Sequence, residues 1–141
     1  MKTSARNQFP GRIQQITIGA VNAEVILNIG GEDSLAAIIT KTSVEQLGLA
    51  PGVEAYAMVK ASWVILTTDD TVQTSARNRL CGIVSRCVEG AVNGEVILEL
   101  PGGQSVVAII TNDSIRTLGL KNGMRACALI KSSHIILAVH D

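Results

Sequence analysis

The chain has few aromatic residues and no excess charge of either sign. Only three of its 141 residues are aromatic, Phe9, Tyr56 and Trp63, so a core has to be built from aliphatic side chains. Twelve basic and twelve acidic residues give a formal net charge of zero. Nucleic-acid binding depends on basic residues that displace counterions, and single-strand binding also uses aromatic platforms. Both shortages argue against a nucleic-acid partner.

Long apolar runs are also missing. No stretch reaches the roughly 20 apolar residues that a membrane-spanning helix needs. The N-terminal segment MKTSARNQFPGR lacks the apolar region of a signal peptide. The cysteines Cys81, Cys87 and Cys127 are odd in number and lack a metal-type C-x-x-C spacing. We therefore expect buried free thiols in a reducing compartment, and a cytoplasmic protein with no membrane partner.

What the sequence does contain is a duplication. The pentapeptide TSARN at 3–7 recurs at 74–78, and the same offset of 71 residues aligns the two halves without a gap. Self-similarity at this length indicates two copies of a small domain. We predict a first domain over residues 1–68, a linker over 69–73 and a second domain over 74–141. Each copy is small for an independent core, so association is expected.

Within one copy, β-branched stretches are separated by turn signals. Strands are expected over 8–18, 22–29, 34–40, 53–60 and 62–67. Between the third and fourth, the segment TSVEQLGL predicts a short helix, with Thr42 and Glu45 as a capping box and Gly48 at its end. In the second copy, Asp113 or Ser114 is the expected cap. The pattern predicts an all-β protein with two tandem, five-stranded barrels similar to the OB-fold, each with one short helix.

Polar residues that recur in both copies indicate what the barrels bind. Hydroxyl, guanidinium and amide groups stand at the start of the first strand, and a lysine with a nearby hydroxyl precedes the last strand. These residues are Ser4, Arg6, Asn7, Lys60 and Ser62, with Ser75, Arg77, Asn78, Lys131 and Ser133 in the second copy. The segments supply hydrogen-bond donors and contain no carboxylate, which suits an oxyanion without a proton. Asn22 and Asn93 lie in GAVN segments, where an asparagine is as typical of a turn as of a ligand-binding residue.

No catalytic or metal-binding set recurs. His134 and His140 align with a tryptophan and an aspartate, so we expect both histidines to lie outside the binding sites. Glu24 and Glu95 do recur, but an outward-facing position in an apolar strand explains them. P-loop and nucleophile motifs are missing. We predict a binding protein and not an enzyme.

Three segments and their second-copy counterparts resemble the molybdate-binding Mop domain: TSARNQ at 3–8, GAVNAEV at 19–25 and KASWVIL at 60–66. Two such domains in one chain are similar to the di-domain molbindins, which store molybdate or maintain its level in the cytoplasm. The resemblance covers both halves. It implies OB-like barrels that exchange a strand, and assembly of the chains into a trimer with anion sites at the interfaces.

By position, the resemblance implies two kinds of molybdate site. The first kind uses Ser4, Arg6, Asn7, Lys60, Ala61 and Ser62, and its counterpart uses Ser75, Arg77, Asn78, Lys131, Ser132 and Ser133. The second kind lies near the threefold axis and uses Val21, Asn22, Val92 and Asn93. The metal is expected as an oxyanion without direct protein ligands, and tungstate as an analogue of molybdate. The alternative function, from another class of protein, is that of an OB-type oligonucleotide-binding module.

Overall fold

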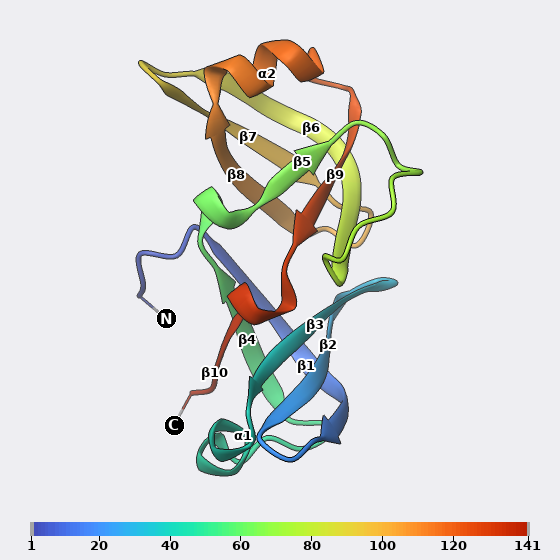
Figure 1. The fold of residues 1–141 in the computed structure, drawn as a ribbon, viewed down its shortest axis with the longest axis vertical. Helices are drawn as coiled ribbons and strands as arrows, with labels where there is room; N and C mark the ends of the chain where they lie inside the picture. The colour runs from blue at the N-terminus through green and yellow to red at the C-terminus, as the bar shows by residue number, and fades with distance from the viewer. Residues whose placement is uncertain (1, 141) are drawn as a thin grey trace.

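The structure is a computed structural model and describes residues 2–140. Both repeats have the same order of elements (Figure 1). The first contains β1 (Asn7–Ile18), β2 (Asn22–Gly30), β3 (Asp33–Thr40), α1 (Lys41–Leu47), β4 (Glu54–Val59), the 3-10 turn η1 (Ala61–Trp63) and β5 (Ile65–Thr67). The second contains β6 (Asn78–Glu89), β7 (Asn93–Glu99), β8 (Ser105–Thr111), α2 (Asn112–Leu118), β9 (Arg125–Ile130), η2 (Ser132–His134) and β10 (Ile136–Ala138).

The two repeats exchange their last strands. The strand orders are β10-β4-β1-β2-β3 and β5-β9-β6-β7-β8, so each five-stranded sheet borrows its edge strand from the other repeat. Figure 1 shows β10 beside β4 in the lower barrel and β5 beside β9 in the upper one. The predicted all-β architecture of two OB-like five-stranded units is confirmed. Each sheet combines strands from both halves of the chain. Residues 69–73 therefore separate the two sequence repeats, and the boundary between two domains at these residues stays a prediction.

Each short helix begins directly where a strand ends. The hydroxyl of Thr40, the last residue of β3, accepts a hydrogen bond from the backbone N–H of Ser43 at 3.0 Å. Thr111 caps α2 in the same way, through Ser114 at 3.1 Å. The expected caps at Thr42, Asp113 or Ser114 were therefore wrong, because no loop separates the strand from the helix. The expected helix end is confirmed, since Gly48 adopts a left-handed φ of 65°.

The last predicted strand of the repeat is shorter than expected. Its first residues form the 3-10 turns η1 and η2, and only three residues remain in β5 and in β10. These turns carry the chain across to the other barrel. They also place Lys60 and Lys131, the residues that cap η1 and η2, at the junction of the two barrels.

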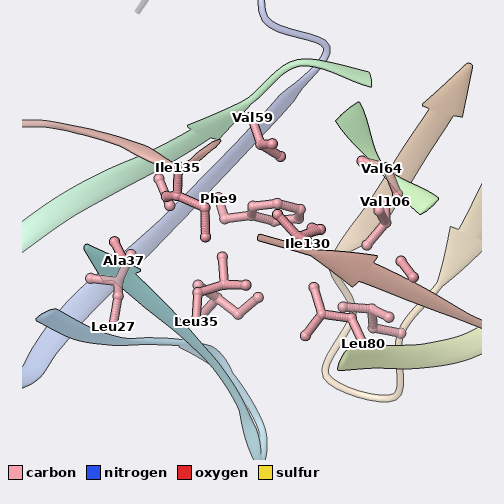
Figure 2. Close-up of a cluster of buried hydrophobic side chains, with 14 of the residues drawn as sticks. Phe9, Leu27, Leu35, Ala37, Val59, Val64, Leu80, Val106, Ile130 and Ile135 are labelled. Carbon is pink, nitrogen blue, oxygen red and sulfur yellow. The ribbon is translucent and has the colours of Figure 1, made fainter. Parts of the chain in front are cut away.

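One hydrophobic cluster runs through both repeats. It is built mainly from Val, Leu, Ile and Ala, and Phe9 lies within it, 1% exposed. Figure 2 shows Phe9 of β1 between side chains of both barrels, among them Leu35 and Ile130. The interface between the barrels is therefore part of the core, and it holds the residues around it in fixed positions.

The expectation of three free thiols was wrong for two of the cysteines. Cys81 and Cys127 form a disulfide, and Cys87 remains free and half-buried. The two bonded residues are 46 positions apart, but the register of β6 and β9 sets them directly opposite each other. The corresponding pair in the first repeat is Pro10 opposite Tyr56. Sequence spacing gives no sign of this pairing, because it depends on which strands become neighbours.

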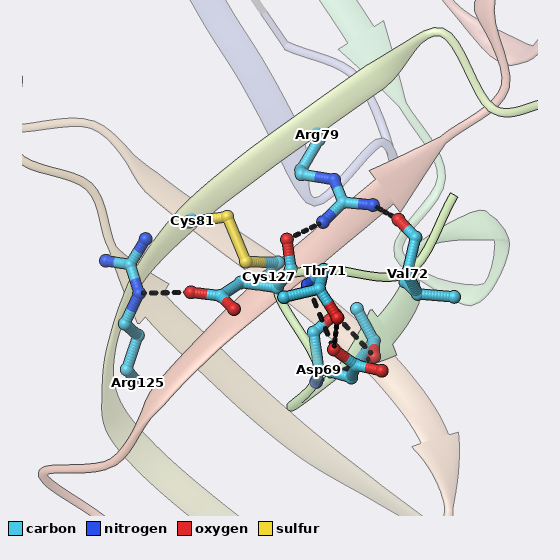
Figure 3. The surroundings of a disulfide bond; sticks show 9 residues. Asp69, Thr71, Val72, Arg79, Cys81, Arg125 and Cys127 are labelled. Atoms are coloured by element: carbon cyan, nitrogen blue, oxygen red, sulfur yellow. Dashed lines mark hydrogen bonds and ion pairs between the residues drawn. A yellow bond between two sulfur atoms is a disulfide. The ribbon is translucent and has the colours of Figure 1, made fainter. Parts of the chain in front are cut away.

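The linker lies over this disulfide (Figure 3). Arg79 donates hydrogen bonds to the backbone oxygens of Asp70 and Val72, and Arg125 pairs with the Asp70 carboxylate at 3.7 Å. Hydrogen bonds from the side chain and backbone of Thr71 lower the pKa of Asp69. The linker is thus tied to the second barrel.

None of the helices within residues 2–140 is long and apolar enough to span a membrane.

Candidate functional site

The structure places Ser4 and Lys60, two of the residues expected in the first kind of site, in the lining of one pocket. The strand β1 begins where β4 ends, with Asn7 opposite Val59, so the segment before β1 meets the residue after β4. Both side chains line a pocket of about 320 Å³, whose lining is Thr3, Ser4, Ala5, Met58, Val59, Lys60, Trp63, His134 and Ile136. We call this the Ser4–Lys60 pocket. The Lys60 ammonium lies 5.8 Å from the centre of the Trp63 ring, within cation–π range.

Asn7 and Asn78 lie in a different environment. Both are buried, at 1% and 3% exposure. The Asn7 side chain donates to the backbone oxygen of Val107 at 2.8 Å and accepts from its N–H at 2.7 Å. Asn78 makes the same pair of bonds to Ala36, at 2.9 and 2.7 Å. Each amide therefore satisfies both the N–H and the C=O of one residue of the other repeat and joins the barrels, so only the backbones of Asn7 and Asn78 remain as candidate anion donors.

The two arginines of the SARN segments each contact a glutamate of the other repeat. Arg6 lies 3.3 Å from Glu95. Arg77 forms two bonds to Glu24, at 2.5 and 3.2 Å, and this partner raises the pKa of the guanidinium. The segments themselves contain no carboxylate, but the fold brings one to each arginine. Glu24 and Glu95 do lie on the face of their strands opposite the buried residues, as expected, but the sequence did not predict their ion pairs with the arginines.

The two arginine–glutamate pairs differ in their surroundings. A second cation, Arg86, lies 3.6 Å from Glu95, whereas its counterpart in the first repeat is Gln15. Glu95 is thus shared between two guanidinium groups. Both glutamates are about one-quarter exposed, which lets solvent weaken these ion pairs.

The residues after the lysines divide between the interior and the surface. Ala61 and Ser132 are buried in their 3-10 turns, at 3% and 8% exposure, while Ser62 and Ser133 are exposed. Ser62 lines a second pocket of about 660 Å³ between β5, β8 and α2. Asn93 and the capping residues Thr111 and Ser114 line the same pocket. The sequence analysis did not single out Thr111, although it recurs at Thr40.

The GAVN segments form exposed turns, away from the Ser4–Lys60 pocket. Val21 and Val92 are 72% and 73% exposed, and their backbone oxygens accept hydrogen bonds from the first residues of α1 and α2. Val92 lines a pocket of about 300 Å³ at the start of α2. Within one chain, the structure leaves Asn22 and Asn93 at opposite barrels (Figure 1).

His134 was expected outside the binding sites, but the structure places it beside two of the expected site residues. It lines the Ser4–Lys60 pocket and stacks on Trp63, with the ring centres 4.8 Å apart. His140 packs edge-on against Tyr56 instead and is not part of that pocket. Because η2 crosses to the first barrel, a residue of the second repeat enters a site of the first. Within residues 2–140, no group of three or more His, Cys, Asp or Glu side chains is arranged to hold a metal ion.

The fold and the paired donor segments define a class of small tandem-barrel binding proteins. A family model described as the TOBE domain matches residues 3–66 and again residues 74–137. The chain belongs to the TOBE-domain family, with two copies of the domain.

Related proteins of known name cover the whole chain. It is 50% identical over 140 residues to the molybdenum transport protein ModE of Azotobacter vinelandii, and 48% identical over 140 residues to the molybdenum-pterin-binding protein MopA of Rhodobacter capsulatus. These matches cover 99% of this chain but only 52% and 53% of the relatives, so the chain spans about half their length. It is also 34% identical, over 52% of that protein, to the DNA-binding transcriptional dual regulator ModE of Escherichia coli.

A solved structure matches the chain from end to end. The cytoplasmic molybdate-binding protein ModG, in a form with molybdate bound, is 48% identical and superimposes with a TM-score of 0.95. The match covers 99% of this chain and 100% of ModG. The two proteins therefore share their architecture as well as their fold class.

Proposed function

We propose that this chain binds molybdate as an oxyanion and stores or buffers it in the cytoplasm. The observation that carries the proposal is the end-to-end match to molybdate-bound ModG, at 48% identity and a TM-score of 0.95. The chemistry of the Ser4–Lys60 pocket supports it independently, since Ser4 and Lys60 both line the pocket and no carboxylate does.

The first kind of site is proposed at the two junctions between the barrels. Ser4, Lys60 and Ser62 offer exposed donors in one copy, and Ser75, Lys131 and Ser133 offer them in the other. Arg6 and Arg77 contribute charge while sharing their donors with the glutamates. For Asn7, Ala61, Asn78 and Ser132, we propose backbone contacts or support of the site, because their side chains are buried.

The second kind of site is proposed at the GAVN turns, through the backbones of Val21, Asn22, Val92 and Asn93. The turns of one chain lie at separate barrels, so several chains are needed to enclose an anion. We propose a homotrimer for this reason. The high exposure of Val21 and Val92 supports burial of these turns between chains.

Binding without catalysis is part of the proposal, and tungstate is expected as a second ligand because its charge and shape match those of molybdate. We also propose that the chain binds no nucleic acid. One relative is a DNA-binding regulator, but the chain matches only half of it, and its net charge is zero.

Equilibrium dialysis of the purified chain with molybdate, followed by elemental analysis, tests the function. We expect saturable molybdenum binding and no co-purified nucleic acid. Lys60→Ala and Lys131→Ala are each expected to remove or weaken sites, whereas Lys121→Ala, in the exposed loop before β9, serves as the matched control. Bound oligonucleotide without molybdenum would refute the proposal and favour the oligonucleotide-binding alternative.

A further inference from the structure

The Ser4–Lys60 pocket contains the imidazole ring of a residue from the other repeat. His134 lines it from the second repeat, beside Trp63 and Lys60 of the first. Trp63 and His134 occupy equivalent positions in the two repeats, and their rings stack at 4.8 Å with an interplanar angle of 35°. The strand exchange has thus placed two non-identical residues, one from each repeat, against each other at the junction of the barrels.

The two nitrogens of His134 have different environments. Its Nδ1 atom is buried and has no hydrogen-bond partner among residues 2–140. A buried N–H without an acceptor is rarer and costlier than a buried lone pair without a donor. The proton of the neutral ring is therefore assigned to Nε2, so that the imidazole has an N–H to donate to a ligand.

We propose that His134 is a further anion-binding residue of the Ser4–Lys60 pocket, where its neutral Nε2–H donates to a tetrahedral oxyanion. This inference rests on the proposed function and adds a donor from the second repeat to that pocket, which Ser4 and Lys60 also line. Lys60 is the only charged side chain in the lining, so no carboxylate competes for the imidazole N–H.

Several contacts fix the position of this donor. The ring stacks on Trp63, Trp63 lies under the Lys60 ammonium at 5.8 Å, and η2 packs against β3 of the first barrel. A donor held by stacking loses little side-chain freedom when the ligand binds. The residue that corresponds to His134 in the first repeat is Trp63, so the two repeats contribute different side chains at this position.

The test uses titration calorimetry of molybdate into the full chain and three variants. His134→Phe keeps an aromatic ring for the stack but removes the donor, and we expect roughly tenfold weaker binding at one class of site. His134→Gln retains an N–H donor and is expected to stay within about threefold of the wild type. His140→Phe, at the other histidine, is the matched control and should bind as the wild type does.

A second readout does not depend on the affinity. Long-range ¹⁵N–¹H correlation spectra of the two histidines at pH 8 should show the Nε2–H tautomer for His134, and molybdate should shift the signals of His134 but not those of His140. An Nδ1–H tautomer, or unchanged affinity in His134→Phe, overturns the inference and leaves molybdate binding intact. Equal losses in the Phe and Gln variants also overturn it, since the N–H would not be the decisive group. A wild type that binds no molybdate overturns both proposals.

Discussion

At the scale of single residues, each arginine of the SARN segments has two candidate partners for its charge, a glutamate and the bound anion. Each contacts a glutamate of the other repeat in the ligand-free chain, and each is proposed to face an oxyanion. An exposed ion pair contributes little to stability, about 0–1 kcal/mol, whereas a charge-assisted bond to a bound dianion is worth about 1.5–3 kcal/mol. The anion is therefore able to compete for the guanidinium.

We expect Arg77→Ala to weaken molybdate binding about 10- to 100-fold, because one charge-assisted donor is lost. The melting temperature should hardly change, since the guanidinium is half exposed. Arg6→Ala should weaken molybdate binding to a similar extent and should also leave the melting temperature nearly unchanged. Titration calorimetry measures the affinity, and Arg125→Ala, which removes an exposed arginine near the linker, is the control. Unaltered affinity in both variants would exclude these arginines from the sites.

The opposite change is expected for the glutamate partner. Glu24→Gln keeps the size of the side chain but removes its charge, so Arg77 becomes free to pair with the anion. We expect tighter molybdate binding, by a few-fold, and a steeper loss of affinity with added salt. Weaker binding in this variant would mean instead that the carboxylate positions the arginine for the ligand.

At the scale of secondary-structure elements, the two buried asparagines connect the barrels. Asn78→Ala leaves the N–H and C=O of Ala36 without their side-chain partners in a buried environment. We expect the free energy of unfolding to fall by about 2–3 kcal/mol, measured by urea denaturation. Gln14→Ala, at an exposed position of β1, should change it by less than about 0.5 kcal/mol. Equal stability of the two variants would contradict this structural role.

The cysteines provide a second prediction at this scale. Burial, and next the charge of Glu89, raise the pKa of the Cys87 thiol, so it stays protonated and reacts slowly at neutral pH. In the unfolded, unreduced chain we expect one reactive thiol, and three after reduction. A colorimetric thiol assay with and without reductant measures both. Three thiols without reductant would show that the pair Cys81 and Cys127 is not bonded in the isolated protein.

The sequence predicted elements well because their signals are local. Alternation of β-branched residues located the strands, and Gly48 marked the end of the first helix. What it missed depends on contacts between distant segments. The disulfide requires β6 beside β9, and the Arg77–Glu24 pair joins residues 53 positions apart. His134 enters the first site only because its strand is exchanged, and the comparison of aligned repeats pointed away from it.

At the scale of the whole molecule, several large apolar side chains remain exposed on one chain. Val21, Val92, Ile65 and Ile136 are 56–73% exposed, although the core has ample apolar residues to bury. Two of them lie on the borrowed edge strands and two in the GAVN turns. Together they favour contacts between chains. We expect light scattering to give about three times the 14.8 kDa of one chain. A compact monomer that binds molybdate would refute the trimer.

Selectivity among oxyanions also follows from the assembled site. Molybdate and tungstate carry no proton at neutral pH, so a set of donors satisfies every oxygen. Phosphate keeps a proton at pH 7, and its O–H needs an acceptor. In the structure, no carboxylate lines the Ser4–Lys60 pocket. An unmatched hydroxyl costs about 1–3 kcal/mol, so phosphate should compete roughly 5- to 150-fold less well.

Competition dialysis with labelled molybdate measures this selectivity directly. Tungstate should displace molybdate at nearly equal concentration, and phosphate only in large excess. The arginines, lysines and serines of the sites do not titrate between pH 6 and 8, so their contribution to the affinity should be flat across that range. Strong displacement by phosphate would mean that an acceptor, and therefore a different set of residues, holds the ligand.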